Sequence, residues 1–537
     1  MKIKTRTVKI AAHLNSDSTP SLQWIETASS LQIPSFHIVG LPSQEVSESR
    51  ERVKAAIESS GLEFPRRRVV INLSPANIKK QGTSLDLGIA LSVLIASFSS
   101  SSQEPHLMVA SGELGLDGTV KNTGQITRTL YATLHSGIEF LFLPTDEVEN
   151  ARQAIELIRK SGENFFIKPP LLIPVSTLSE AWKILVEFQS GKSIQIQKKI
   201  PNHQKEQEIT TQPTYSLLPL TPSLERVLGI VTAGDHHLFI LGPRGTGKSH
   251  ALEWLIALQQ PPHPKIKLQQ ILLAELNLHK QEKTSLLDAP IRRRVGVQAR
   301  PAALIGNASS TQIRPGEFSL AHGGLLIADE LPEWARDSRE ALREPLERGL
   351  ITLTRTHGSF EMPAQFTLVA NGNYCPCGGW PSELPISKEE LKTKKISLCN
   401  CSFKIKKQYL SKLSGPILDR IDLVLKLSGI PHGETQPLTN DSILKLKSKI
   451  LETRHRLIKK WGAVSGQLSA TALEEIFISF PVLHSEKVIL ETTSYRSRHK
   501  ILKIALTLAA WDGQDFPSSS HLREAAYYRP EMSGLSM

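Results

Sequence analysis

The first candidate for chemistry is a glycine-rich segment near the middle of the chain, residues 242–249, which reads GPRGTGKS. It follows an apolar stretch, HHLFIL, and precedes a stretch of helical periodicity, HALEWLIAL, so strand, loop and helix stand in the order that a phosphate-binding loop requires. Glycines let backbone N–H groups approach phosphate oxygens, Lys248 can reach the β and γ phosphates, and the Ser249 hydroxyl can ligate Mg²⁺. The segment predicts an ATP site formed by Gly242, Pro243, Arg244, Gly245, Thr246, Gly247, Lys248 and Ser249.

Two adjacent acids supply the second half of a nucleotide site. The segment GLLIADE, residues 324–330, is an apolar strand that ends in Asp329 and Glu330. In phosphate-loop enzymes an acid at this place holds Mg²⁺, and its neighbour can polarise the water that attacks the γ phosphate. A solvated strand end is the alternative interpretation. The distance from the phosphate loop leaves room for crossover elements, so we predict a Mg²⁺ site of Ser249 and Asp329, with Glu330 as the catalytic residue.

A parallel sheet with crossover helices must position these residues, and the surrounding sequence has that pattern. Apolar runs such as HHLFILG, GLLIAD and FTLVAN alternate with helical segments, which predicts an α/β core. Helices are also predicted for Val46–Ser59, Leu85–Ala96, Ile443–Lys460 and Ser497–Ala510. Composition sets the boundaries: an N-terminal domain over residues 1–188, a polar linker over 189–216, the core over 217–430 with a four-cysteine insert at 375–401, and a helical domain over 431–537.

Composition also limits the partners and the compartment. The chain has 537 residues, a net charge of +12 and a pI near 9.4, so its average surface attracts polyanions such as nucleic acid, although a basic surface also serves solubility. Four cysteines in so long a chain argue against a disulfide framework. The start of the sequence lacks a signal-peptide core, and the longest apolar stretch is far short of the ~20 residues of a membrane span. We therefore expect a cytoplasmic protein without membrane contact.

Three runs carry a family resemblance: RPGEFSLAHGGLLIADELPEWARDSREALREPLERGLITLTR, FTLVANGNYCPCG and LSGPILDRIDL. They resemble the core of the Mg-chelatase-like ATPases of the ComM (YifB) family, and the match extends from near His37 to about Tyr528. The resemblance implies an AAA+ P-loop ATPase core, an N-terminal Lon-protease-like (ribosomal S5-like) α+β domain and a C-terminal helical lid. Two segments depart from the family pattern: Arg244 replaces a more usual proline, and VQAR at 297–300 replaces a proline followed by histidines.

The resemblance also assigns roles to polar residues outside the two nucleotide motifs. Asn373 matches the sensor-1 residue that orients the lytic water, although a turn asparagine is the plainer interpretation. Arg420 matches the arginine finger that reaches the γ phosphate of a neighbouring subunit, which implies a ring, by family likeness a hexamer. Arg496, at the start of a helix, matches the sensor-2 arginine of the lid, and Arg498 is a competitor for that role.

Four cysteines form two C-x-C pairs inside the core. If the segment between them folds back, the thiolates of Cys375, Cys377, Cys399 and Cys401 suit a structural Zn²⁺, and reduced thiols or a redox pair are the alternative. A lysine cluster surrounds the pairs and could meet phosphates or be a solvated face: Lys388, Lys392, Lys394, Lys395, Lys404, Lys406 and Lys407.

Two further segments allow a functional and a plainer interpretation. Leu350–Met362 predicts a hairpin with its turn at His357–Gly358, either a pore hairpin that brings Arg355 and His357 to a substrate or a simple edge hairpin. In the N-terminal domain, Ser84 stands roughly where the nucleophile of a Lon-type protease lies. Such a serine needs a base, and Thr127 stands where the dyad lysine is expected, with Lys121 out of register.

Three functions follow, in order of support. The first is an ATP-driven motor on branched or single-stranded DNA, a branch-migration helicase of ComM type used in the recombination of incoming DNA during natural transformation. The second is a protein-remodelling ATPase like the ATPase subunit of magnesium chelatase. The third is a Lon-like ATP-dependent protease, which the missing lysine disfavours.

Overall fold

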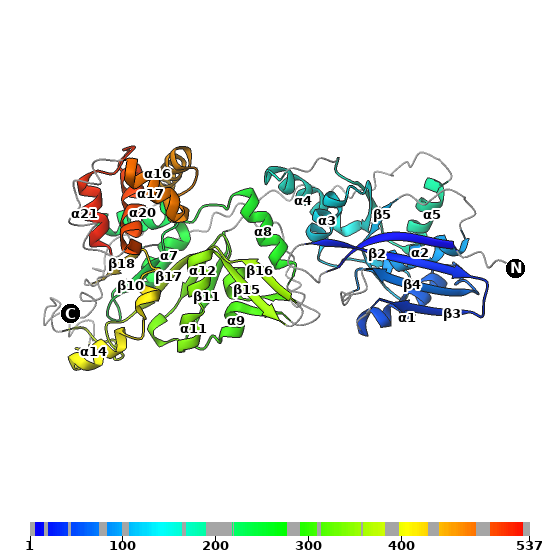
Figure 1. The fold of residues 1–537 in the computed structure, drawn as a ribbon, viewed down its shortest axis with the longest axis horizontal. Helices are drawn as coiled ribbons and strands as arrows, with labels where there is room; N and C mark the ends of the chain where they lie inside the picture. Colours follow the sequence, from blue (N-terminus) through cyan, green and yellow to red (C-terminus); the bar gives the residue numbers. More distant parts are fainter. Residues whose placement is uncertain are drawn as a thin grey trace.

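The described residues form two large sheets, one in the N-terminal part and one in the core, three two-stranded sheets and a group of C-terminal helices, as the computed structural model in Figure 1 shows. The predicted linker, 189–216, lies outside the described residues except for Gln189, which ends a helix. The structure describes residues 6–14, 20–40, 44–74, 83–98, 107–163, 168–189, 217, 220–276, 290–308, 313–355, 358–381, 397–427, 440–479 and 495–529.

The N-terminal part is built on a seven-stranded mixed sheet in the order β3-β4-β2-β1-β5-β8-β9. β1, β2 and β4 are antiparallel neighbours, β3 lies parallel to β4, and β5, β8 and β9 continue from β1 in parallel. More and less buried positions alternate along β2 and β4, as the two-residue period of a strand requires. The strands are β1 (Arg6–Leu14), β2 (Ser21–Ser30), β3 (Ser35–Val39), β4 (Arg68–Ser74), β5 (Met108–Ala110), β8 (Phe140–Pro144) and β9 (Leu171–Val175), with a small pair β6 (Glu113–Leu114) and β7 (Val120–Lys121).

Helices pack on this sheet. In α2 every residue from Asp86 to Ala96 is buried, and its sequence is apolar or small at nearly every position, as a helix covered on all sides requires. Both helices predicted in this part are confirmed, with ends shifted by one or two residues. The bounds are α1 (Gln44–Ser59), α2 (Asp86–Phe98), α3 (Ile126–Ser136), α4 (Val148–Lys160) and α5 (Leu178–Gln189), with a 3₁₀ turn η1 at Thr145–Glu147.

The core sheet has five parallel strands in the order β11-β14-β17-β10-β18. Its central strands are apolar throughout, as strands covered on both faces must be: LFIL in β10 and LLIA in β14 are fully buried. The predicted α/β core with a parallel sheet is therefore confirmed. The strands are β10 (Leu238–Leu241), β11 (Arg292–Val295), β14 (Leu325–Ala328), β17 (Thr367–Gly372) and β18 (Leu423–Lys426).

Helices and two hairpins complete the core. α6 begins with Pro222 after Thr221, whose hydroxyl accepts the Leu224 N–H, so its start is fixed by proline and by a side-chain cap. The helices are α6 (Pro222–Gly234), α7 (Lys248–Leu258), α8 (Pro264–Ala274), α9 (Pro301–Ile305), α10 (Glu317–Leu320), α11 (Arg336–Glu340), α12 (Arg343–Arg348), α14 (Phe403–Leu410) and α15 (Gly415–Leu418), with a 3₁₀ turn η2 (Leu331–Glu333). The hairpins are β12 (Gly306–Ala308) with β13 (Ile313–Pro315) and β15 (Leu350–Arg355) with β16 (Gly358–Pro363).

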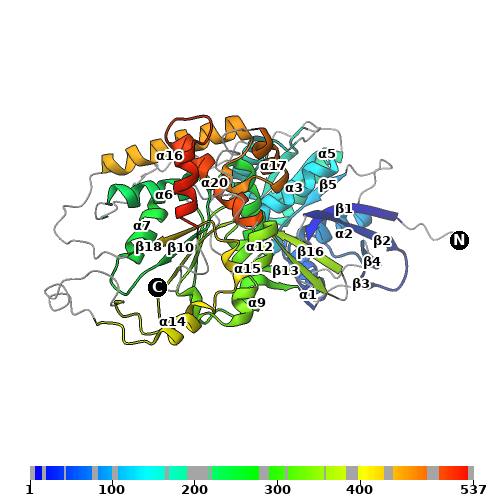
Figure 2. The ribbon, with the colours of Figure 1, turned by 60° about the vertical axis from the view of Figure 1, so that its left-hand side comes forward.

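The C-terminal helices pack on α6 and α7 of the core. Figure 2 shows the long α16 lying across this side of the molecule, and α20 shares an apolar cluster with α6, α7 and α16. Arg226 of α6 ties the two parts together through the carboxylates of Asp512 and Glu524, each 2.7 Å away. The bounds are α16 (Asn440–Trp461), η3 (Ser465–Gln467), α17 (Ala470–Ser479), α20 (Tyr495–Trp511) and α21 (Ser519–Tyr527), which confirm both predicted helices.

The N-terminal part meets the core at α8, which lies beside α3 and α4 in Figure 1. Glu275, directly after α8, accepts the backbone N–H groups of Thr127 (3.2 Å) and Arg128 (2.8 Å) at the start of α3. A carboxylate is favourable there because the first N–H groups of a helix have no partner inside the helix. Apolar side chains of α8 also join the cluster formed by α3 and α4. A charged group from the core thus completes a helix of the N-terminal part.

Neither an N-terminal Lon-protease-like fold nor a lid role for the C-terminal helices is tested by this architecture, and both stay predictions. Among the helices that the structure describes, none combines the length and the apolar character needed to span a membrane.

Candidate functional site

The phosphate loop is the turn between β10 and α7. Gly245 (φ 81°) and Gly247 (φ 85°) adopt left-handed backbone conformations that only glycine takes without strain. A Cβ on Gly242 would lie 2.9 Å from the Leu427 carbonyl oxygen, so a side chain does not fit there. Ser249, in the first turn of α7, is exposed. The sequence therefore builds a helix N-terminus with open backbone N–H groups, an arrangement suited to phosphate.

Lys248 points back across its own loop. Its ammonium group donates hydrogen bonds to the carbonyl oxygens of Gly242 and Pro243, both at 2.7 Å, and to Oδ1 of Asn373 at 2.9 Å. Burial lowers the pKa of Lys248 to about 8, with nearby Arg244 lowering it further and Glu330 opposing the shift. The predicted P-loop lysine and the predicted sensor-1 residue are thus in direct contact.

The two acids lie at the carboxyl end of β14, which β17 separates from β10 and its phosphate loop in the sheet order. Glu330 has φ 49° and ψ 48°, a left-handed conformation that is costly for a residue with a Cβ, about 1–3 kcal/mol. Its side chain is exposed, whereas Asp329 is half-buried. Strained residues of this kind persist only where neighbours hold them, and they concentrate at functional sites.

Asn371, a residue that the sequence motifs did not single out, contacts both acids. Its amide nitrogen donates to Oδ1 of Asp329 at 2.8 Å, and its amide oxygen accepts the backbone N–H of Glu330 at 2.8 Å. A signal for it exists in the sequence: positions 371 and 373 are two residues apart at the end of one strand and therefore share a face. Asparagines at both positions place two amides against the nucleotide motifs.

Asp329 also pairs with Arg294 of the edge strand β11, whose guanidinium bonds its second carboxylate oxygen. The hydrogen bond and the charge of Asp329 raise the pKa of Arg294. Both oxygens of this carboxylate therefore have partners. A Mg²⁺ ion held by Asp329 and Ser249 would compete with the arginine for one of them.

Arg420 and Arg496 meet at one carboxylate, although 76 residues separate them in sequence. Glu347 of α12 pairs through Oε2 with Arg420 and through Oε1 with Nη2 of Arg496 at 3.0 Å. Arg420 follows α15 and Arg496 lies in the first turn of α20, so core and C-terminal helices both contribute. The hydrogen bond from Arg420 lowers the pKa of Glu347. Arg420 therefore has an ion pair within its own subunit.

Arg498, the competitor for the sensor-2 role, turns to another partner. Its guanidinium lies 2.7 Å from Oε1 of Glu474 in α17 and stacks on the Phe477 ring at 4.7 Å. Its side chain is 22% exposed, against 54% for Arg496. Arg496 is therefore the better placed of the two to leave its carboxylate and bind a phosphate.

The four cysteines come together. Their Sγ atoms all lie within 4.8 Å of one another, with 3.1 Å between Cys375 and Cys377 and 3.3 Å between Cys375 and Cys399. Tetrahedral Zn²⁺ with Zn–S bonds of about 2.3 Å would set the sulfurs about 3.8 Å apart, so the donor set fits Zn²⁺. Burial raises the pKa of Cys375. For Cys377 the effect of burial is outweighed by hydrogen bonds from Cys375 and the Gly379 N–H, and the pKa falls to about 7.

The cysteine cluster abuts the phosphate loop. The Arg244 N–H donates to the Gly378 carbonyl at 3.0 Å, and a Cβ on Gly378 would lie 2.6 Å from Nε of Arg244. Cys375 follows Asn373 by only two residues. A metal at the four thiolates would therefore fix a turn that touches the nucleotide loop on one side and the predicted sensor on the other.

The structure describes the predicted hairpin and the predicted lysine cluster only in part. β15 and β16 pair from Leu350 with Pro363 to Arg355 with Gly358, which confirms the hairpin. Gly358 belongs to a strand and not to the turn, and His357 and the Arg355 side chain lie outside the described residues. Of the predicted lysine cluster, Lys404 and Lys407 are exposed on α14, which follows the second cysteine pair. The lysines at 388, 392, 394 and 395 lie outside the described residues.

The predicted remnants of a protease site are buried. Ser84 is 7% exposed and Thr127 3% exposed, and the backbone of Thr127 is occupied by Glu275. Lys121 is on the two-residue strand β7 and exposed.

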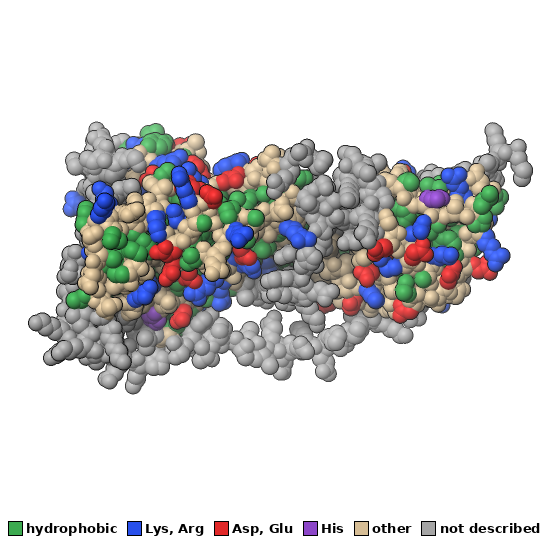
Figure 3. Space-filling view, turned by 90° about the horizontal axis from the view of Figure 1, so that it is seen from below, with side chains coloured by type: hydrophobic (Ala, Val, Ile, Leu, Met, Phe, Trp, Pro, Cys, Tyr) green, Lys and Arg blue, Asp and Glu red, His purple; other side chains and the backbone are tan. Residues whose placement is uncertain are grey.

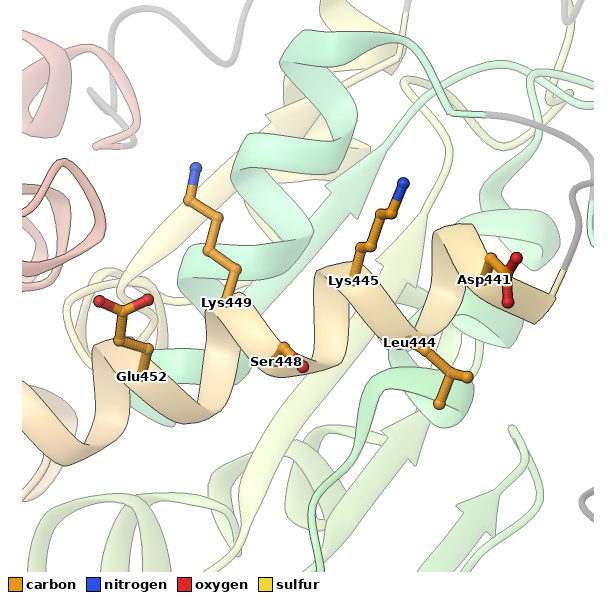
Figure 4. A pocket seen from close by; sticks show the side chains of 6 residues that line it. All are labelled: Asp441, Leu444, Lys445, Ser448, Lys449 and Glu452. Atoms are coloured by element: carbon orange, nitrogen blue, oxygen red, sulfur yellow. The ribbon is translucent and has the colours of Figure 1, made fainter.

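A surface hollow along α16 lies apart from these motifs (Figure 4). Lys445 and Lys449, four residues apart, extend from the same side of the helix, and Glu452 follows one turn later. The Lys449 ammonium lies 4.3 Å from the centre of the Trp511 ring, so this lysine already has a partner in α20. The hollow offers no group of the nucleotide motifs.

Comparison with known proteins decides the family. The family described as magnesium chelatase, subunit ChlI, matches residues 221–435, and a second family description, subunit ChlI of Mg-chelatase, matches residues 25–147. Protein YifB of Escherichia coli (strain K12) is 30% identical over 518 residues, which cover 94% of this chain and 93% of the relative. This chain belongs to the YifB/ComM family of Mg-chelatase-like proteins. Competence protein ComM of Haemophilus influenzae is similar at 29% identity, covering 92% of each chain.

Membership of the YifB/ComM family fits the geometry already described. A Mg-chelatase-like AAA+ protein uses ATP and Mg²⁺, and the phosphate loop, the two acids and the sensor asparagine lie together at one end of the parallel sheet, as those ligands require. The individual roles of these residues stay predictions.

Proposed function

We propose that this YifB/ComM-family protein hydrolyses ATP between β10, β14 and β17. The contact of Lys248 with Asn373 carries the proposal, because it brings the phosphate-binding lysine against the residue that would orient water. The loop N–H groups and Lys248 would hold the β and γ phosphates, and Ser249 and Asp329 would hold Mg²⁺. Glu330 then polarises the attacking water, and its left-handed backbone directs the carboxylate out of the strand end.

The same proposal makes the active form a ring of subunits, a hexamer by family likeness. Arg420 and Arg496 share Glu347, so the two guanidiniums lie close together, with the Arg496 side chain 54% exposed and the Arg420 side chain 12% exposed. A γ phosphate of a neighbouring subunit would replace Glu347 as their partner, and the transition state would gain two positive charges.

Mixing two inactive variants tests the shared site. Arg420→Ala should abolish turnover by removing the finger, and Glu330→Gln by removing the water-activating group. In a mixture, a subunit with Arg420→Ala still has Glu330, and a neighbouring subunit with Glu330→Gln still has Arg420. Such a pair contains one complete site, so part of the activity should return. A mixture as inactive as its components would contradict a site shared between subunits.

For the substrate we propose branched or single-stranded DNA, moved by ATP-driven cycles, in a branch-migration role during recombination of incoming DNA. The net charge of +12 supports it, as do exposed Lys404 and Lys407 beside the cysteine cluster and the name of one relative, a competence protein. The basic excess is not a uniform coat: on the face seen in Figure 3, lysine and arginine side chains are interspersed with acidic ones. We infer that contacts with DNA are local.

Binding to a labelled four-way junction at rising salt tests the substrate. A DNA ligand predicts steep loss of affinity with salt, and a Lys404→Glu/Lys407→Glu double variant should bind more weakly with a shallower salt slope. Lys160→Glu, an exposed lysine of α4, is the matched control and should bind like the parent. Salt-insensitive or absent binding would sink the DNA proposal and favour the second candidate, remodelling of a protein partner.

We also propose a structural Zn²⁺ at Cys375, Cys377, Cys399 and Cys401. The fit of the four sulfurs to tetrahedral ligation supports it. When bound, the metal would supply no chemistry to hydrolysis, and the residues around it would keep the Gly378 turn against the phosphate loop.

A further inference from the structure

Asn371 occupies a place between the two acids that no sequence motif assigns. It is the fifth residue of β17 and pairs in the sheet with Ile240 of β10, so the strand fixes its backbone. Its side chain is 7% exposed and uses both ends of the amide, the oxygen for the Glu330 N–H and the nitrogen for Asp329. Only an asparagine-like group offers an acceptor and a donor at these two points.

The hydrogen bond to Glu330 matters because of that residue's backbone. Glu330 has a positive φ of 49°, a conformation that a residue with a Cβ leaves unless something holds it. Among the described contacts, the bond from its N–H to Asn371 holds it from the adjacent strand. Without that acceptor, the peptide group before Glu330 can rotate, and its carboxylate moves away from the γ-phosphate side.

The second bond acts on the metal ligand. Asp329 has one oxygen on Asn371 and the other on Arg294. The amide therefore fixes the rotation of the carboxylate and leaves the arginine-bound oxygen as the one that a cation can take by displacing Arg294.

We propose that Asn371 is a positioning residue for ATP hydrolysis, whose amide oxygen fixes Glu330 and whose amide nitrogen orients Asp329. The inference rests on the proposed ATPase, since it assigns a role within that site. Asn371 does not touch the phosphates in this account. It acts through the two acids, so it should change turnover and the Mg²⁺ requirement much more than nucleotide affinity.

Two variants separate the two bonds. Asn371→Ala removes both, whereas Asn371→Asp keeps an acceptor for the Glu330 N–H and replaces the donor to Asp329 by a second carboxylate. Asn72→Ala is the control, because Asn72 also donates from a strand to a carboxylate, that of Glu26 at 3.0 Å, but in the N-terminal sheet. The first measurement is hydrogen exchange of the peptide that contains Glu330, without nucleotide, and the second is steady-state ATP turnover against ATP and Mg²⁺.

In Asn371→Ala, the Glu330 amide should exchange faster with solvent than in the parent. The kcat should fall by about tenfold or more, while the Kd for ATP should stay within about threefold of the parent. The Mg²⁺ concentration that gives the half-maximal rate should rise. Asn371→Asp should keep parent-like exchange, because the acceptor for the Glu330 N–H remains, while its kcat should fall because Asp329 loses its donor and faces a second carboxylate. The control should match the parent in all of these. Parent-like exchange and kcat in Asn371→Ala would overturn the proposal, as would equal losses of kcat and ATP affinity in both variants. If the parent itself does not hydrolyse ATP, the proposed function fails, and the exchange result alone still decides whether Asn371 holds Glu330.

Discussion

The lowered pKa of Lys248 predicts both the direction and the size of a pH effect on ATP affinity. Burial holds the pKa of this lysine at about 8, while phosphate oxygens bind its charged form. In the free protein the neutral form therefore becomes dominant as pH rises through 8, and nucleotide binding must then take up a proton. Affinity for ATP should fall with rising pH in a range where an ordinary lysine would show no change.

The magnitude follows from the pKa. If only the charged form of Lys248 binds ATP, Kd is inversely proportional to the charged fraction of this lysine. Between pH 7.5 and 9.0, Kd should then rise about eightfold for a pKa of about 8. For a lysine with an ordinary pKa, the rise would be less than about 5%. The charge of a terminal phosphate is nearly constant over that range, because its second pKa is about 6.

The assay is titration with a fluorescent, non-hydrolysable ATP analogue at fixed Mg²⁺ and ionic strength. Lys248→Arg is the control, since a guanidinium stays charged throughout and the variant's Kd should not change with pH, whatever its absolute affinity. A parent Kd that stays constant between pH 7.5 and 9.0 would refute the reasoning, and so would the same slope in parent and control.

Three other predictions concern stability and the metal. Burial raises the pKa of Glu147 to about 8, so the folded protein favours the protonated carboxyl. The stability that this preference gives is fully present below the ordinary pKa of 4.5 and is lost as pH rises through 8. Glu147→Gln should therefore flatten the fall in melting temperature between pH 5 and 8. A chelator should release about one Zn²⁺ per chain, and Cys399→Ser should be purified with less Zn²⁺ than the parent, as measured by metal analysis. Both changes should weaken ATP binding in a nucleotide titration. A parent chain purified without zinc would contradict the proposed metal site. Arg226→Ala should lower the free energy of unfolding by about 1–2 kcal/mol, because its carboxylate partners are half-buried, whereas Arg159→Ala in an exposed pair should leave denaturant unfolding nearly unchanged.

Local motifs could be predicted from the sequence, because their physics is local. A strand, a glycine-rich turn and a helix follow one another within residues 238–258, so the spacing alone indicates the phosphate loop. The same holds for the β14 acids and for the helices α16 and α20, whose periodicity set their ends within a few residues.

Contacts between distant segments could not be predicted in this way. Glu347 meets Arg420 and Arg496 across 73 and 149 residues, and Glu275 caps α3 across 148, pairings that no periodicity records. The two cysteine pairs are a further case, because only the fold brings their sulfurs within 4.8 Å of one another. Asn371 is the intermediate case: its strand and its face were predictable, but its partners depend on the strained backbone of Glu330.

The central claim is that this site hydrolyses ATP with Glu330 as the group that activates water. It is tested most directly by measuring ATP turnover and ATP binding for the parent and for Glu330→Gln side by side. The account predicts Mg²⁺-dependent turnover in the parent, and in the variant parent-like ATP binding with turnover lowered about 100-fold or more. A variant that hydrolyses ATP at the parent's rate, or a parent that binds ATP without hydrolysing it, would contradict the account.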